Sequence, residues 1–344
     1  MPGARRVRIP ALAALFVLTT ACLAWAGSPS TPGSQHTALD LWTTEQLAQP
    51  LNPAQAQAER HIRPLPKPDT SPPARTSPLH ATAPVSTAQS GIIRRVALPE
   101  GDRRVALTFD LCERAIHTTG YDAALVDALR AANARATFFA GGKWMRSHPE
   151  RSMQLMADPR FELGNHSWTH ANMFVVTPNE FDQQVQWANA QFELLREQLR
   201  RRLSTAGFAD APQTALRLFR LPYGRGNATT AARLNHMGLA VIQWDVVGEG
   251  GGNAEQRARE ILAEVRPGSI ILLHANAIPH DTAGIVRHLL QLLAQNGYTT
   301  ATVSELLAAG TPETAPDGYF SSPGDNHIYD TMFHGHGSLG RAHR

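Results

Sequence analysis

The stretch "RVALTFDLCE", residues 104–113, decides how this sequence is interpreted. Its apolar run at 105–109 is typical of a buried strand. An aspartate, a cysteine and a glutamate then follow within four positions, as Asp110, Cys112 and Glu113. Ionisable residues directly after a buried strand indicate that the strand ends at a functional site.

Strand-like and helical segments alternate seven times from about residue 98 onward. The predicted strands are 104–110, 136–141, 161–166, 216–222, 239–246, 269–275 and 298–303. The predicted helices are 121–133, 148–157, 177–203, 228–237, 254–265, 281–296 and 304–309. Consecutive strand–helix units favour a parallel α/β fold. Seven units close more naturally into a distorted barrel than they spread as an open sheet, although periodicity alone does not decide between the two.

The segment 177–203 carries the strongest helix signals in the sequence. Thr177 can cap the helix, Pro178 suits its first turn, and Glu180 completes a reciprocal capping pair. Apolar residues then recur at alternating spacings of four and three, which places one stripe against a core. The members of this stripe are Phe181, Val185, Ala188, Phe192, Leu195 and Leu199.

Residues 1–26 have the pattern of a secretory signal peptide. Three arginines precede an apolar stretch at 9–23, and "AWA" at 24–26 is a cleavage signal. The stretch is shorter than the ~20 residues of a membrane span. "TTAC" at 19–22 loosely resembles a lipobox, which leaves a lipid anchor on Cys22 as the alternative. The sequence predicts an exported protein, periplasmic or extracellular, whose membrane contact is limited to the precursor's signal segment or to that anchor.

The rest of the chain divides into three parts. Residues 27–97 are rich in Pro, Ser, Thr and Ala, which predicts a flexible spacer with at most a short helix within 38–60. Residues 98–310 carry the alternating pattern and form the predicted domain. Residues 311–344 are expected to be an irregular C-terminal tail that could pack back on the domain.

Charge gives no argument for a nucleic-acid partner. The precursor carries +3, but cleavage would remove three arginines and no acid, which leaves the mature chain formally neutral. The basic cluster at 196–202 lies on a predicted helix beside Glu193 and Glu197, so a solvated helix face explains it. Cys112 is the only cysteine left after cleavage, so the mature chain can form no internal disulfide.

Polar residues gather at the ends of five predicted strands. Besides those after the first strand, they are His166 and His170, Arg220 and Tyr223, Trp244 and Asp245, and His274. The carboxyl ends of parallel strands form one face, so these residues are expected to build one site. Two histidines four positions apart can share a metal ion if the chain turns helical after the strand. With a carboxylate and an open position they give the pattern of hydrolytic zinc.

These stretches, in this order, resemble the five motifs of the polysaccharide deacetylase domain (NodB homology, carbohydrate esterase family 4). The matching motifs are "TFD", "HSWTH", "RLPY", "QWD" and "LLH". The resemblance covers residues 103–308 and implies that 98–310 is a catalytic domain with the fold of a distorted (β/α)7 barrel. It also implies metal-dependent removal of N- or O-acetyl groups from an acetylated polysaccharide or oligosaccharide.

The resemblance assigns roles to individual residues. His166 and His170 would bind the metal, Asp110 would be the general base, and His274 would be the general acid that protonates the leaving group. Arg220 would hold Asp110 by a charge-assisted pair.

Three further positions would contact the substrate or the oxyanion. The backbone amide of Tyr223 would help to stabilise the oxyanion, and Trp244 would form an apolar wall. Asp245 is assigned to the same group. In the family, the motif that contains Trp244 carries a further acid after the tryptophan, but Val247 and Gly250 stand near its usual places in this chain. Asp245 and Glu249 are the two possible substitutes for it.

The first motif departs from the family, which has a second aspartate where this chain has Leu111. If the strand persists, Leu111 points away from Asp110 and Cys112. The third metal ligand is then Asp110, Cys112 or Glu113. We predict Glu113, because it has the longer reach and leaves Asp110 free as the base; the reverse assignment stays open.

The sequence therefore predicts an exported deacetylase that acts on an envelope or extracellular glycan. Its cofactor would be one divalent ion, with zinc favoured over cobalt or another metal. Two alternatives remain, a catalytically impaired glycan-binding module of the same fold and an amidase acting on a non-sugar C–N bond.

Overall fold

A computed structural model describes residues 37–337, except 51, 61, 212, 278–280 and 335–336. The predicted signal peptide at 1–26, the possible anchor at Cys22 and the last seven residues of the tail lie outside this description. Within the described residues, none of the helices combines the length and the apolar character that crossing a membrane requires.

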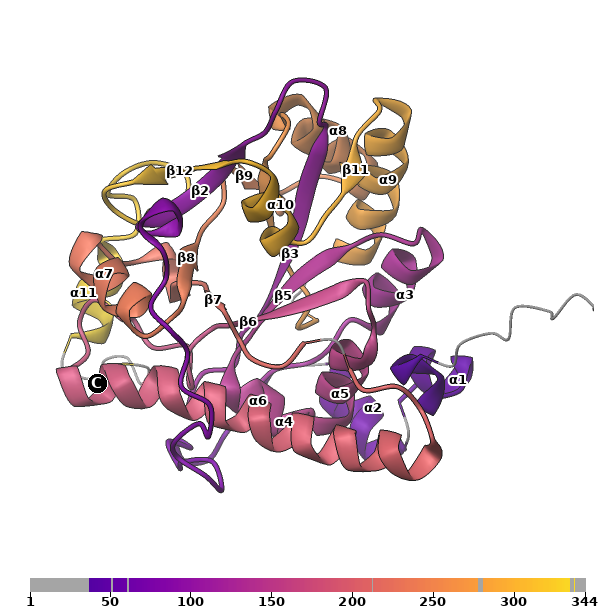
Figure 1. Ribbon diagram of the computed structural model, residues 1–344, viewed down its shortest axis with the longest axis vertical. Helices are drawn as coiled ribbons and strands as arrows, with labels where there is room; N and C mark the ends of the chain where they lie inside the picture. Colours follow the sequence, from indigo (N-terminus) through magenta and orange to yellow (C-terminus); the bar gives the residue numbers. More distant parts are fainter. Residues whose placement is uncertain are drawn as a thin grey trace, which may run out of the picture. The chain divides into compact units, whose positions relative to one another are not determined.

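One curled sheet organises the fold (Figure 1). Its strands are β2 (Ile92–Ala97), β3 (Arg104–Leu111), β5 (Ala136–Ala140), β6 (Phe161–Asn165), β7 (Leu218–Phe219), β8 (Ala240–Ile242), β9 (Val246–Val247), β10 (Ile270–His274), β11 (Thr299–Thr300) and β12 (Thr311–Ala315). They follow the order β12-β2-β8-β7-β6-β5-β3-β10-β9, with β11 beside β3. Every pairing is parallel except that of β12 with β2. The predicted α/β fold class is confirmed.

Strand β2 links the two ends of the row of parallel strands. It pairs with β8 through Ile92 and Ile93. Farther along the same strand, the Val96 amide donates to the Gly268 carbonyl at 3.1 Å, immediately before β10. The sheet therefore curls into a distorted barrel, and the strand that links its ends comes from the region predicted to be spacer.

Helices surround the sheet, and each of the seven predicted helices has a counterpart. These counterparts are α3 (Ala123–Ala131), α5 (Pro149–Ala157), α6 (Pro178–Ala206), α7 (Ala228–His236), α8 (Ala254–Glu264), α9 (Thr282–Gln295) and α10 (Val303–Ala309). Two further helices, α4 (Gly142–Ser147) and α11 (Ile328–Phe333), were not predicted. Thr177 caps α6 by accepting from the Glu180 amide at 3.3 Å. The helix ends at Gly207, whose left-handed φ of 76° is favourable only for a residue without a Cβ.

The segment before the barrel was expected from its composition to be a flexible spacer, and its described residues from 37 onward include several short helices and strands. It forms η1 (Ala38–Leu41), α1 (Thr44–Ala48), α2 (Pro53–Arg60), the strand β1 (Arg63–Pro64), which pairs with β4 (His117–Thr118), and η2 (Thr87–Gln89). Trp42 is buried, and the Glu59 carboxylate pairs with Arg151 of α5 at 2.7 Å. A few anchors of this kind hold a Pro-rich chain without raising its average hydrophobicity, which is why composition misses them.

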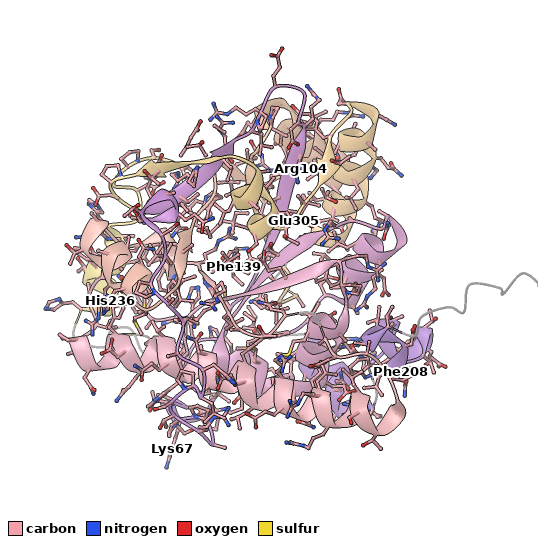
Figure 2. The ribbon with its side chains drawn as sticks, in the orientation of Figure 1. Lys67, Arg104, Phe139, Phe208, His236 and Glu305 are labelled. Carbon is pink, nitrogen blue, oxygen red and sulfur yellow. The ribbon has the colours of Figure 1, made fainter. Side chains whose placement is uncertain are left out.

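Side chains of β3 alternate between two environments. Val105, Leu107, Phe109 and Leu111 all pack in one apolar cluster, whereas Ala106 belongs to another. Thr108 and Asp110 share the Ala106 face, because successive residues of a strand point to opposite sides. In Figure 2, Phe139 of β5 lies in the middle of the molecule and Lys67 at its edge. The alternation expected for Leu111 is therefore present.

The anchoring of the N-terminal segment can be tested with Glu59→Gln. This change leaves the fully buried Arg151 guanidinium without its carboxylate partner. We expect the free energy of unfolding to fall by about 3–5 kcal/mol in urea titration. Proteolytic cleavage within α1 and α2 should become faster than in the wild type. Glu45→Gln, at an exposed position of α1, is the matched control, and equal stabilities for the two variants would contradict this account.

Candidate active site

A buried ion pair forms the floor of the site. Arg220 directly follows β7, and its Nη1 donates to Asp110 Oδ1 at 3.0 Å and to Thr108 Oγ1 at 2.8 Å. The remaining guanidinium nitrogens donate to backbone carbonyls of the β8 end, at Ile242 and Gln243. Burial lowers the pKa of Arg220, while Asp110 opposes this shift. The pair expected from the sequence is thus formed, with Thr108 as an additional partner.

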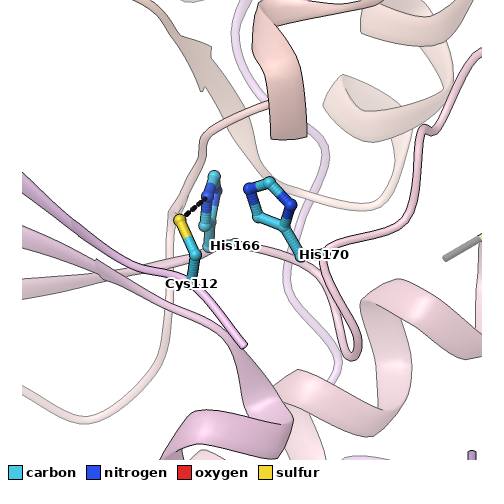
Figure 3. A group of neighbouring side chains, drawn as sticks. All are labelled: Cys112, His166 and His170. Atoms are coloured by element: carbon cyan, nitrogen blue, oxygen red, sulfur yellow. Dashed lines mark hydrogen bonds between the residues drawn. The ribbon is translucent and has the colours of Figure 1, made fainter. Parts of the chain in front are cut away.

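The two histidines of the "HSWTH" stretch, His166 and His170, lie side by side next to Cys112 (Figure 3), and His166 contacts the ion pair. Their ring centroids are 4.8 Å apart. His166 Nδ1 faces the Arg220 carbonyl at 3.0 Å, which orients Nε2 toward Cys112 Sγ at 3.3 Å and Asp110 Oδ2 at 3.5 Å. A backbone acceptor on one ring nitrogen fixes the other as a lone-pair donor, which is how metal-binding histidines are commonly oriented.

The histidines converge through left-handed residues rather than through the helical turn that was expected. Ser167 has φ of 63° and His170 has φ of 55°, both unusual for residues with a Cβ. The Asn165 side chain accepts from the Ser167 amide at 2.8 Å, and Gln184 of α6 accepts from two further amides of the loop. These contacts stabilise a strained loop next to the site.

Cys112 is the third side chain that meets the histidine pair. The donor atoms of Cys112, His166 and His170 all lie within 4.8 Å of one another and could hold a metal ion. The 3.3 Å between sulfur and Nε2 is close to the about 3.5 Å expected for a sulfur and a nitrogen on one tetrahedral zinc. His170 Nδ1 is buried and has no hydrogen-bond partner among the described residues. The donor types and this unpartnered nitrogen fit a metal site.

The charge states of the cluster suit a cation. Burial works to raise the pKa of the Cys112 thiol, but His170 and His166 outweigh it and bring that pKa well below its usual value. Burial also works to lower the pKa of His166, whereas Asp110 and Cys112 raise it above the ordinary value. In His170 burial prevails and the pKa is lowered. The cluster thus favours a thiolate, the form of cysteine that binds metals.

Glu113 is not brought to the histidines. Its Oε1 accepts from Lys143 Nζ at 2.7 Å and from Ser147 Oγ at 2.6 Å, and its Oε2 accepts from the Thr119 amide at 3.1 Å. Lys143 and Glu113 are both buried. Both oxygens of Glu113 are thus engaged by other groups, and Cys112 stands beside the histidines instead.

His274 at the end of β10 lies opposite Asp110 of β3 in the parallel register. Its Nδ1 and its backbone amide both contact the Glu249 carboxylate, each at 2.7 Å. Burial works to lower the pKa of His274, but Glu249 and Cys112 outweigh it and raise that pKa well above 6.5. Asp245 does not contact His274; its carboxylate accepts from Ser269 Oγ at 2.9 Å and from the Ile270 amide at 2.8 Å. Of the two acids considered for this motif, Glu249 is the one that contacts the histidine.

A cavity of about 160 Å³ opens above these groups. Its walls include Tyr223, which has a left-handed φ of 60°, and Trp244, whose Nε1 donates to the Phe320 carbonyl at 2.9 Å. The lining residues are Asp110, His170, Leu221, Tyr223, Gly224, Trp244, Leu272, His274, Phe320 and Tyr329. The cavity thus joins half of the predicted polar residues to two aromatic rings from the C-terminal tail.

Comparison with known proteins identifies the family. Residues 97–242 match the family model described as polysaccharide deacetylase. A chitooligosaccharide deacetylase from Azorhizobium caulinodans is 31% identical over 162 residues, which cover 46% of this chain and 70% of that protein. The chain belongs to the polysaccharide deacetylase family. The resemblance inferred from the five motifs is therefore confirmed.

Two other proteins similar to this chain differ from it in length. A bifunctional xylanase/deacetylase from Pseudobutyrivibrio xylanivorans is 28% identical over 209 residues, and the chain spans only 31% of its length. A deacetylase structure with substrate shares 27% identity and a TM-score of 0.50, covering 62% of this chain and 94% of that chain. The barrel that carries the site is therefore a deacetylase fold.

Several residues near the site were not identified from the sequence. Lys143 lies 30 positions from Glu113, so no local pattern links the two. Phe320 and Tyr329 come from a tail with no regular periodicity. Thr108 gave a signal that could have been used, since a threonine inside an apolar strand, two positions before Asp110, shares its face.

The buried contact of Glu113 leads to a prediction that separates a structural role from metal binding. Glu113→Gln should leave Lys143 with an uncompensated buried charge and lower the free energy of unfolding by about 3–5 kcal/mol. The metal content of the folded protein should stay at the wild-type value. Adding Lys143→Met to this variant should recover part of the lost stability. A metal-free Glu113→Gln protein of unchanged stability would contradict this assignment.

Proposed function

We propose that this chain is a metal-dependent hydrolase that removes N-acetyl or O-acetyl groups from an acetylated polysaccharide or oligosaccharide outside the cytoplasm. One observation carries the proposal. Asp110, which is held by Arg220, His170 of the Cys–His–His cluster and His274, which is held by Glu249, line one cavity at the carboxyl ends of the strands. These are the groups that acyl-transfer chemistry with a metal requires.

Cys112, His166 and His170 would hold the ion. Two imidazoles and a thiolate favour zinc, although cobalt or another divalent ion could bind the same donors. When bound, such an ion supplies Lewis-acid polarisation of the acyl carbonyl and lowers the pKa of water. Cys112 is chosen over Glu113 because its sulfur stands beside His166 whereas both oxygens of Glu113 are engaged elsewhere. It is chosen over Asp110 because Asp110, whose Oδ1 accepts from Arg220, is needed as the base.

The remaining side chains would move protons and position the substrate. Asp110, aligned by Arg220, would accept the proton of the attacking water, and His274 would donate a proton to the leaving amine or alcohol. Glu249 would keep His274 protonated and oriented. The Tyr223 backbone amide would stabilise the oxyanion, and Trp244 would form the wall beside the acyl methyl group.

A second candidate function is glycan binding without turnover. The observation that favours it is Cys112 itself, because a thiolate ligand weakens the metal as a Lewis acid. Hydrolysis of a non-sugar amide would use the same groups. Acetate release measured on acetylated sugars and on simple amides separates these alternatives.

The separate roles of Cys112 as metal ligand and Asp110 as general base predict different losses when each residue is replaced. Cys112→Ser should lower metal affinity more than about 100-fold, beyond the loss caused by removing an outer-shell partner. Asp110→Asn should keep the metal but lower kcat by about 10²–10⁴-fold, the range of general-base catalysis. Cys112→Asp, which restores an anionic ligand, is the matched control and should retain metal. Metal analysis and acetate release are measured on all three.

Two outcomes would contradict the assignment. If Asp110→Asn is metal-free while Cys112→Ser keeps its metal, the carboxylate is the ligand and the thiol is not. If wild type binds metal but releases no acetate from sugars or simple amides, the binding module is the correct function.

The raised pKa of His274 predicts the alkaline limit of activity. A general acid works while it is protonated, so activity should fall as pH rises through the raised His274 pKa. Glu249→Gln removes the main group that raises this pKa and should move the alkaline limb of kcat/KM to lower pH. Glu255→Gln, on α8, is the control and should leave the profile unchanged. An identical alkaline limb in all three proteins would refute the role of Glu249.

A further inference from the structure

The N-terminal segment 63–73, here called the strap, contacts both loops that carry the candidate metal ligands. Its sequence, "RPLPKPDTSPP", precedes residues 97–242, which match the polysaccharide deacetylase model. Lys67 of the strap lies at the edge of the molecule (Figure 2), while Pro73 is buried. Proline fixes φ at five positions of the strap, so the strap loses little conformational entropy when it packs on the barrel.

The first contact of the strap is with the loop that follows Cys112. Strand β1, at the start of the strap, pairs with β4 of this loop, and the Asp69 amide donates to the Ala115 carbonyl at 2.8 Å. The loop leads to Thr119, whose Oγ1 donates to the Cys112 carbonyl at 2.7 Å. The strap therefore stabilises a loop that in turn holds the backbone of a candidate ligand.

The second contact is with the loop that carries the two histidines. Trp168 lies between His166 and His170 in the sequence and is buried. Its Nε1 donates to the Ser71 carbonyl of the strap at 3.2 Å. The neighbouring Ser167 has a left-handed φ of 63°, and a backbone strained in this way persists only where its surroundings fix it. The strap supplies one of the contacts that fix this loop.

Arg146 of α4 joins the two contacts. It forms an ion pair with Asp69, and its Nη1 donates to the Ser71 carbonyl at 3.1 Å and to Ser71 Oγ at 2.9 Å. The guanidinium carbon also lies 4.9 Å from the centroid of the Trp168 ring, which is within the range of a cation–π contact. One side chain thus binds both the strap and the indole of the histidine loop.

The same helix reaches the residue after Cys112. Lys143, on the first turn of α4, pairs with Glu113 at 2.7 Å, and its backbone amide donates to the Trp168 carbonyl at 2.9 Å. Helix α4, the strap and both ligand loops therefore form one connected unit, in which a shift of α4 would displace donors in both loops. These contacts act on the protein before any ion is bound.

We infer that the strap positions the candidate metal ligands, with Asp69 and Ser71 as its contact residues. These two residues act through Arg146 and Trp168. An ion binds tightly to a site whose donors are already held near their final positions, because binding then does not have to order the loops. The inference rests on the three-residue metal cluster of the proposed function, and it makes part of the predicted spacer a component of the active site.

Metal affinity tests this inference, with Co²⁺ as the probe and Zn²⁺ as its competitor. Arg146→Gln should lower the affinity for both ions by about 10–100-fold, the loss expected when an outer partner of a metal site is removed. Asp69→Asn removes the charge that Arg146 pairs and should weaken binding in the same direction. The double variant should bind no more weakly than Arg146→Gln alone, since the effects of two residues that act through one contact are not additive. Both side chains are partly exposed, so the variants should fold.

Arg75→Gln is the matched control. Arg75 lies just beyond the strap and pairs with Glu193 and Glu197 of α6 rather than with a ligand loop. Its replacement should keep the metal affinity within about threefold of the wild-type value, because a partly exposed ion pair contributes little. A second readout is the thiolate-to-cobalt charge-transfer absorption at saturating Co²⁺, which depends on the geometry at Cys112. This absorption should shift or weaken in Arg146→Gln and stay unchanged in Arg75→Gln.

The outcomes separate this inference from the proposed function. Wild-type affinity and an unchanged cobalt spectrum in Arg146→Gln would overturn the positioning role and leave the deacetylase function intact. An equal loss of affinity in Arg75→Gln would overturn it too, because general loosening of the chain would then be the cause. Wild-type protein that binds the ions but releases no acetate would refute the proposed function alone. Wild-type protein that binds neither Co²⁺ nor Zn²⁺ would refute both.

Discussion

The buried ion pair between Arg220 and Asp110 is the contact on which the arrangement of the site depends. The guanidinium joins the ends of β3, β7 and β8, because it donates to Asp110 and Thr108 and to the carbonyls of Ile242 and Gln243. A charge buried at this depth is tolerated only with such complete pairing. It leaves the second oxygen of Asp110 beside His166, and so connects the structural core to the chemistry.

The sequence predicted the parts of the site that follow strand periodicity. His166, Arg220 and His274 each end a strand, and parallel strands bring their carboxyl ends to one edge. The alternation of β3 correctly turned Leu111 into the core and left Asp110 and Cys112 on the other face. These features depend on local patterns within single elements, which a sequence displays directly.

The rest depends on contacts between distant segments, which no local pattern contains. Glu113 was predicted as a metal ligand, but its carboxylate forms an ion pair with Lys143 of α4, which lies far from it in the sequence. Strand β2 lies in the region predicted to be spacer. The sequence did not indicate it, because a strand of six residues is too short to stand out in a Pro-rich region. The C-terminal segment 317–333 is placed by Asp330 and Asn326, whose partners lie about a hundred residues earlier.

The central claim of this account is that Cys112 replaces a carboxylate as the third metal ligand. X-ray absorption spectroscopy of the zinc-loaded protein tests it most directly, because sulfur and nitrogen neighbours differ in distance and scattering. The account predicts one sulfur at about 2.3 Å together with two imidazole nitrogens at about 2.0–2.1 Å. A shell of nitrogen and oxygen neighbours alone, with no sulfur at the longer distance, would contradict it.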